Sequence, residues 1–144
     1  MKPVHILLAE DNEGDIMLTL EAFEEGKLLH TVSVVRDGKE AIDYLNKTGR
    51  YKDGETPDFV LLDINLPKKN GQEVLRFIKT NDLLKHIPVI VLTTSSSEKD
   101  IAQSYNNYAN CYITKPVEMN EFINAILKVE DFWINIVKLP NSQK

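Results

Sequence analysis

Several features that define special classes of protein are absent from this chain of 144 residues. Cys111 is the only cysteine, which excludes an intramolecular disulfide and a metal site built on several cysteine ligands. No apolar run approaches the roughly 18 residues of a membrane-spanning helix, and the amino-terminal segment lacks the apolar stretch of a signal peptide. We therefore expect a cytoplasmic protein that does not insert into a membrane.

Basic charge is also scarce, because 17 lysine and arginine residues stand against 22 aspartate and glutamate residues. The net charge of −5 and the lack of a basic cluster with interleaved aromatic residues argue against nucleic acid as a partner. Apolar residues make up 42% and charged residues 27% of the chain, as in an ordinary globular protein. The length predicts a single domain over residues 1–144.

Strand-like and helix-like segments alternate along the chain, and no repeat or composition break marks a linker. Short apolar runs predict five buried strands, at residues 4–9, 31–35, 59–62, 88–92 and 111–114. Amphipathic patterns predict five helices, at about 13–25, from Gly38 to 48–49, at 72–81, after Ser97 and at 117–137. Polar loops are expected at 50–57 and 65–71. The alternation predicts an α/β fold with a doubly wound parallel sheet of strand order 2-1-3-4-5.

Charged side chains directly follow three of the predicted strands. Glu10 and Asp11 follow the first strand, Asp63 follows the third and Lys115 follows the fifth. Ligands of doubly wound sheets bind beyond the carboxyl ends of the strands, and the expected order makes strands one and three neighbours. Taken singly, each charged residue is explained more simply as marking the point where a strand meets solvent. All of them are expected at the same edge of the sheet, however, and this favours one common site.

Crowded carboxylates must be neutralised, and carboxylate oxygens, waters and a phosphate are the ligands that Mg²⁺ prefers. Asp63, on the central strand, is best placed to act as a nucleophile that becomes an aspartyl phosphate. Lys115 can pair with Asp63 at rest and with phosphoryl oxygens afterwards, and Thr93 offers a hydroxyl to the same group. These residues predict a magnesium-dependent phosphoryl site.

Four segments give the chain a resemblance to the receiver domains of two-component response regulators over essentially its whole length. They are LLAEDN, LLDINLPKKNG, VIVLTT and CYITKP. The spacings between Asp63, Thr93 and Lys115 are also those of receivers. The resemblance implies a flavodoxin-like receiver fold in which Asp63 is the phosphoacceptor and Thr93 and Lys115 bind the phosphoryl group. It also implies a conformational switch in which Tyr112 turns inward when Thr93 follows the phosphate.

The same resemblance implies a ligand set for Mg²⁺. Asp11 and Asp63 would bind the ion directly together with the backbone carbonyl of Asn65, and Glu10 would contribute through water. Glu10 stands where receivers more often have aspartate, which lengthens the carboxylate by one methylene group and leaves metal binding intact. No other cofactor is implied.

Further segments are similar to the small stand-alone regulators that serve phytochrome-type histidine kinases. They are CYITK, DFWINIVKLP, NLPKKNGQEVL and VLTTS. This similarity implies a phytochrome-type histidine kinase as the partner, with no separate output domain. The last helix has a wide apolar face, which together with Tyr105 and Tyr108 predicts a homodimer through the last two helices and the fifth strand. The alternative is that the long helix folds back on its own domain.

Two other classes of protein share parts of this pattern. A Mg²⁺-dependent phosphohydrolase of the haloacid-dehalogenase type also uses an aspartate nucleophile, but it needs a second aspartate at the position of Asn65. A cofactor-binding domain of flavodoxin architecture would carry a glycine-rich phosphate loop after the first strand, and this chain has none there. We therefore predict a signalling domain that carries out only its own phosphorylation and dephosphorylation, rather than an enzyme.

Overall fold

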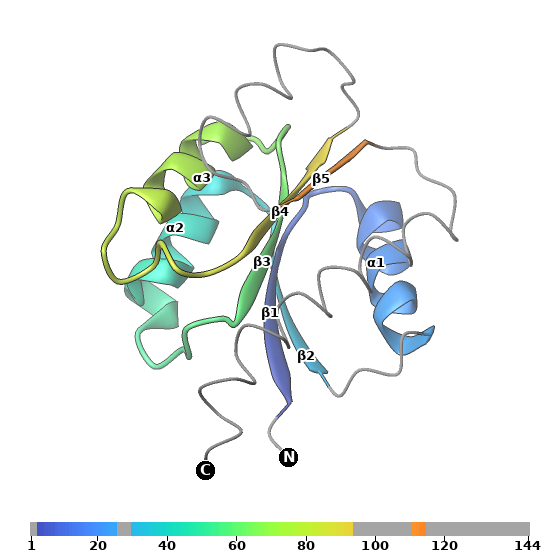
Figure 1. Ribbon diagram of the computed structural model, residues 1–144, viewed down its shortest axis with the longest axis horizontal. Coiled ribbons are helices and arrows are strands. Elements are labelled where there is room, and N and C mark those ends of the chain that lie inside the picture. The colour runs from blue at the N-terminus through green and yellow to red at the C-terminus, as the bar shows by residue number, and fades with distance from the viewer. Residues whose placement is uncertain (1–2, 26–29, 94–110, 115–144) are drawn as a thin grey trace.

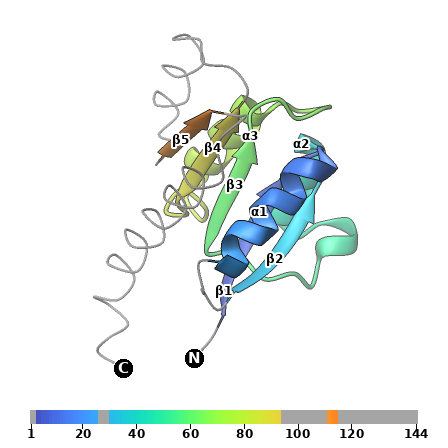
Figure 2. The same cartoon turned by 90° about the vertical axis from the view of Figure 1, so that its right-hand side faces the viewer.

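Five parallel strands form one sheet in the computed structural model, which describes residues 3–25, 30–93 and 111–114. The strands are β1 Val4–Ala9, β2 His30–Val35, β3 Phe59–Asp63, β4 Val89–Thr93 and β5 Cys111–Thr114. They lie side by side in the order β2-β1-β3-β4-β5 (Figure 2). The strand order expected from the alternating pattern is confirmed, and β3 lies at the centre of the sheet.

Helices cover both faces of this sheet. The described helices are α1 Glu13–Glu25, α2 Gly38–Asn46 and α3 Gly71–Lys79, and a single 3-10 turn, η1, spans Gly49–Tyr51. Figure 1 shows α2 and α3 on one face and α1 on the other. The helices expected after Ser97 and at 117–137 lie outside the described residues. Within the described ranges, no helix has the length and apolar character needed to cross a membrane.

The start of α3 is fixed by a reciprocal pair of hydrogen bonds. The Asn70 side chain accepts from the backbone N–H of Glu73 at 3.0 Å, and the Glu73 carboxylate accepts from the backbone N–H of Asn70 at 3.2 Å. This capping box satisfies two N–H groups that have no partner inside the helix. It explains why α3 begins at Gly71, before the expected start at residue 72.

The structure corrects the expectation of a polar loop at 50–57, because η1 occupies its first residues. Tyr51 packs on Tyr44 of α2, with ring centroids 5.0 Å apart, and donates its hydroxyl proton to Glu40 at 2.7 Å. Burial, followed by the bond to Glu40, raises the pKa of Tyr51. The aromatic ring therefore draws this turn onto α2, an attraction that the polar composition of the segment conceals.

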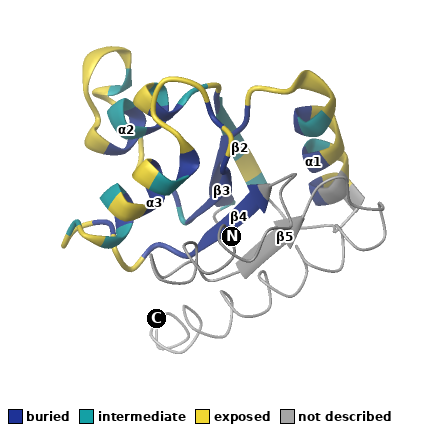
Figure 3. Ribbon diagram, turned by 90° about the horizontal axis from the view of Figure 1, so that it is seen from above, coloured by how far each residue is buried: buried dark blue, intermediate teal, exposed yellow. Residues whose placement is uncertain are grey.

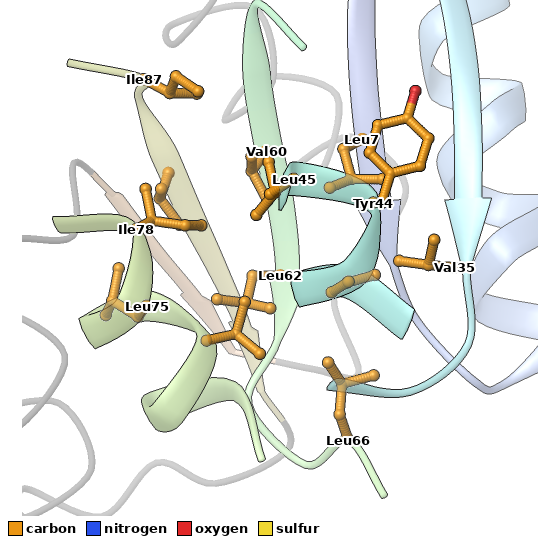
Figure 4. Close-up of a cluster of buried hydrophobic side chains, with 14 of the residues drawn as sticks. Leu7, Val35, Tyr44, Leu45, Val60, Leu62, Leu66, Leu75, Ile78 and Ile87 are labelled. Atoms are coloured by element: carbon orange, nitrogen blue, oxygen red, sulfur yellow. The ribbon is translucent and has the colours of Figure 1, made fainter. Parts of the chain in front are cut away.

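Successive strand residues face opposite sides of the sheet, so the strands supply two separate cores. One core lies beneath α2 and α3 (Figure 4), and its members include Leu7, Val60, Leu62, Leu75 and Ile78. The other lies beneath α1 and includes Ile6, Leu8, Ile16, Phe23 and Leu61. In Figure 3 the buried strands run between helices whose outer surfaces are exposed. This double burial gives a rigid sheet, from whose edge the charged residues extend.

The capping box gives the first testable prediction. Replacing Asn70 by alanine should lower the free energy of unfolding by about 1 kcal/mol, because the cap on Glu73 is lost. Urea unfolding followed by circular dichroism measures this. Asn46→Ala, at the exposed last residue of α2, is the matched control and should change the stability by less than about 0.5 kcal/mol. Equal effects of the two substitutions would contradict the role of the cap.

Candidate metal and phosphoryl site

The carboxyl ends of β1 and β3 meet at one edge of the sheet. Ala9 pairs with Leu62 across the two strands, so that the next residues, Glu10 just after β1 and Asp63 at the end of β3, lie at the same edge of the sheet. The backbone N–H of Glu10 donates to the carbonyl of Val35 in β2 at 3.0 Å. This bond extends the pairing with β2 to the residue just after β1. The sheet itself therefore brings these two acidic residues together.

Three carboxylates converge at this edge. One oxygen each from Glu10, Asp11 and Asp63 lies within 4.8 Å of the other two. Glu10 is fully buried and Asp63 is only 3% exposed, whereas Asp11 is open to solvent. The convergence predicted from the sequence is confirmed. The cluster has a buried base and one open side through which a ligand can enter.

Backbone N–H groups orient the two buried carboxylates. Asp63 Oδ1 accepts from the N–H of Asn65 at 2.9 Å, and Glu10 Oε2 accepts from the N–H of Asn12 at 3.2 Å. In both cases the donor lies two residues further along the chain, a local bond that is typical of acidic side chains at turns. Asn12 in turn accepts from the N–H of Asp15 at 2.9 Å at the start of α1. Each carboxylate is thus fixed by the loop that follows it.

The composition of the cluster suits a hard divalent cation. Closely spaced carboxylates repel one another, and a cation of charge +2 removes most of this repulsion. In an octahedral Mg²⁺ site two opposite oxygens lie about 4 Å apart, since each bond is about 2 Å long. The oxygens of Glu10, Asp11 and Asp63 lie within 4.8 Å of one another, so they must move closer to bind one ion directly. The three oxygens can therefore surround one small cation after minor movement.

The other predicted site residues are placed only in part. Thr93 ends β4 directly after Leu92, which pairs with Asp63 of β3, so its backbone lies at the same edge of the sheet. Tyr112 lies in β5 and pairs with Val91. The structure gives the backbone positions of these two residues, and Lys115 lies outside the described part of the chain. Their roles stay predictions.

Gly71 is a residue whose contribution the sequence analysis missed. Its N–H donates to the carbonyl of Ile64 at 2.9 Å, and a Cβ atom at this position would lie 2.5 Å from the carbonyl oxygen of Asp63. Only glycine permits this approach of α3 to the residue that carries the central carboxylate. The glycine in PKKNG indicated a turn, but its contact with Asp63 became visible only in three dimensions.

Comparison with known proteins identifies the class of protein to which this fold and site belong. Residues 6–127 match the family model of the response regulator receiver domain. The chain therefore belongs to the response regulator receiver family, whose flavodoxin-like fold it shares.

Individual relatives support this assignment. Response regulator Rcp1 of Synechocystis sp. is 42% identical over 138 residues, which covers 96% of this chain and 94% of Rcp1. The crystal structure of the phosphorylated cyanobacterial phytochrome response regulator RcpA is 46% identical with a TM-score of 0.84, and the match covers 92% of this chain and 95% of that chain. The Mn²⁺-bound form of Rcp1 is 42% identical with a TM-score of 0.82, covering 91% and 94%.

The crowding of charges gives the second prediction. Asp11→Asn removes one of three neighbouring negative charges, so in the presence of EDTA it should raise the free energy of unfolding by about 1 kcal/mol, the size of the interaction between unit charges about 4 Å apart in water. Urea unfolding measures this. Asp53→Asn, an exposed loop substitution of the same chemistry, should have an effect below about 0.5 kcal/mol. A loss of stability in Asp11→Asn would show that the carboxylates do not repel one another.

Proposed function

We propose that this protein is a response regulator that accepts a phosphoryl group on Asp63 from a histidine kinase. The observation that carries the proposal is the position of Asp63, which is 3% exposed at the end of the central strand with oxygens of Glu10 and Asp11 within 4.8 Å. Membership of the receiver family supports a signalling role. The phosphoryl group would thus be received where three carboxylates meet the end of the central strand.

The proposed reaction is a direct displacement at phosphorus. A carboxylate oxygen of Asp63 forms a bond to phosphorus while the bond from phosphorus to the imidazole nitrogen of the donor histidine breaks, and that nitrogen retains the electron pair. The N–H of Asn65, bonded to Asp63 Oδ1 at 2.9 Å, holds the carboxylate plane in position for the attack. Positioning of this kind accounts for much of the catalysis in phosphoryl transfer.

Mg²⁺ is the proposed cofactor. Asp11, Asp63 and the backbone carbonyl of Asn65 would bind it directly, with Glu10 acting through water. When bound, the ion would neutralise the carboxylates and the phosphoryl oxygens. The oxygen-only donor set supports this proposal, and a relative, Rcp1, has been crystallised in an Mn²⁺-bound form.

The proposed switch lies on the other side of Asp63. Thr93 and Lys115 would bind the phosphoryl oxygens, and Tyr112 would respond when the Thr93 hydroxyl moves toward them. The register of the sheet supports this assignment, because Thr93 follows the residue that pairs with Asp63 and Tyr112 lies on the adjoining strand β5. The conformational response to the new charge would then pass from β3 through β4 to β5.

The proposed partner is a phytochrome-type histidine kinase. RcpA, which is 46% identical to this chain, is described as a cyanobacterial phytochrome response regulator. A cytoplasmic location is proposed with this partner. We also propose a single receiver domain over residues 1–144 and a homodimer through the last two helices and β5. β5 lies at the edge of the sheet among the described strands, and an edge strand can pair with a second chain, which supports the dimer.

The alternative reading, a phosphohydrolase with an aspartate nucleophile, has less support. Such an enzyme needs a second carboxylate two positions after the nucleophile, and that position is occupied by the amide side chain of Asn65. An amide cannot donate and recover a proton as a general acid and base does. The proposed activity is therefore limited to the protein's own phosphorylation and dephosphorylation.

The central prediction concerns Asp63. Incubation of the protein with acetyl phosphate and Mg²⁺ should add the mass of one phosphoryl group, and Asp63→Asn should abolish this gain because the amide is not a nucleophile. Intact-protein mass spectrometry measures both. Asp82→Asn, at an exposed position after α3, is the matched control and should be phosphorylated like the wild type. An equal gain in Asp63→Asn would refute the assignment.

The partner assignment gives a further prediction. A phytochrome-type histidine kinase, labelled with ³²P on its histidine, should lose its label to the wild-type protein within minutes and should keep it in the presence of Asp63→Asn. Gel autoradiography over time measures the transfer. A histidine kinase of an unrelated sensor class is the control and should transfer more slowly by at least about tenfold, a specificity of about 1.4 kcal/mol. Equal rates would leave Asp63 as phosphoacceptor and refute only the partner.

A further inference from the structure

The loop from residue 64 to residue 70, here called the β3–α3 loop, is held by hydrogen bonds at two places. At its base, the N–H of Gly71 donates to the carbonyl of Ile64 at 2.9 Å. At its tip, the N–H of Gly38 in α2 donates to the carbonyl of Pro67 at 3.1 Å. A Cβ atom on Gly38 would overlap the carbonyl group of Lys69, so the helix start and the loop tip are in direct backbone contact. Asn65 lies between these two attachments.

Lys68, at the tip of this loop, has an unusual backbone conformation. Its φ is +67°, in the left-handed region that non-glycine residues rarely adopt and that costs on the order of 1 kcal/mol. Its Nζ lies 3.5 Å from Asp37 Oδ2, just before α2. The other oxygen of Asp37, Oδ1, accepts from the N–H of Glu40 at 2.7 Å and caps the helix. One carboxylate therefore contacts both the start of α2 and the strained tip of the loop.

We propose that Asp37 and Lys68 are positioning residues for the Mg²⁺ site. This inference rests on the proposed function. Asn65 would supply the site with its backbone carbonyl, and its N–H already bonds Asp63 Oδ1 at 2.9 Å. Asn65 lies between the attachment of the loop base at Ile64 and the attachment of its tip at Pro67. A shift of the tip relative to α2 therefore displaces the Asn65 backbone. The ion pair holds that tip against α2, although neither charged side chain belongs to the proposed ligand set.

Removal of Lys68 separates this mechanism from a simple effect of charge. A positive charge near the site repels Mg²⁺, so Coulomb's law alone predicts that Lys68→Met binds the ion more tightly. A positioning role predicts the opposite, namely that Lys68→Met binds Mg²⁺ more weakly. We expect the Mg²⁺ dissociation constant to rise about threefold, within the roughly fivefold limit that one exposed ion pair can supply. Methionine has a Cβ like lysine, so the substitution leaves the backbone strain unchanged.

Lys69→Met is the matched control, since Lys69 is the next residue of the loop and its ammonium pairs with Glu73 rather than with Asp37. Its Mg²⁺ affinity should stay the same or increase. Titration of ¹⁵N-labelled protein with MgCl₂, followed by amide resonances, gives each dissociation constant. In Lys68→Met the resonance of Asn65 should already be shifted before Mg²⁺ is added, and in Lys69→Met it should not. Tighter binding in Lys68→Met, or identical behaviour of the two variants, would overturn the proposal.

The acidic partner is tested in the same way. Asp37→Asn keeps an oxygen that can cap α2 but loses the ion pair, and it should also weaken Mg²⁺ binding about threefold, within the same limit for an exposed pair. Asp43→Asn removes an equal charge from within α2, where the carboxylate pairs with Lys39, and should have no such effect. Absence of Mg²⁺ binding in the wild type would refute the proposed function. If the wild type binds Mg²⁺ and the variants Asp37→Asn and Asp43→Asn bind it with equal affinity, only the positioning role is refuted.

Discussion

The rest of this structure depends on the burial of like charges at the joined ends of β1 and β3. Two carboxylates, Glu10 and Asp63, are held in the buried edge of the sheet with Asp11 beside them. Ionised groups lose hydration when they are buried, so such an arrangement lowers stability unless it is compensated. The compensation lies in the two apolar cores, which bury both faces of the central strands. A well-packed sheet can carry an unfavourable cluster that a loop or a single helix could not hold.

The local loops convert this crowded edge into an ordered site. Each buried carboxylate accepts an N–H from the residue two positions further on, and each following loop leads into a capped helix. Backbone N–H groups therefore take part in orienting both buried carboxylates. Backbone donors of this kind lose little freedom when a ligand arrives, which is the basis of preorganised electrostatic sites. The carboxylates are thus held close together by the fold itself.

The sequence predicts some of these features well because they are local. Apolar runs and their alternation with helical patterns predict a doubly wound parallel sheet, for which 2-1-3-4-5 is a common order. With that order, the acidic residues at the ends of β1 and β3 are expected to meet. The contact of Gly38 with the β3–α3 loop and the left-handed backbone of Lys68 were not predictable in this way. The Gly38 contact joins segments far apart in the chain, and no residue pattern marks the conformation of Lys68. The turn η1 was missed because the polar composition of its segment conceals the packing of Tyr51 on Tyr44 and its bond to Glu40.

The distribution of these attachments bears on the direction in which a signal can leave the site. On the α2 and α3 side, the β3–α3 loop is fixed by backbone bonds at Ile64 and Pro67 and by glycines that leave no space for displacement. A new negative charge on Asp63 would have to break several of these contacts to move that side. On the opposite side, β4 ends at Thr93, directly beside the central strand. The backbone of Thr93 lies there, one residue beyond the pair formed by Leu92 and Asp63. These attachments argue against the α2 and α3 side as the route by which a signal leaves the site.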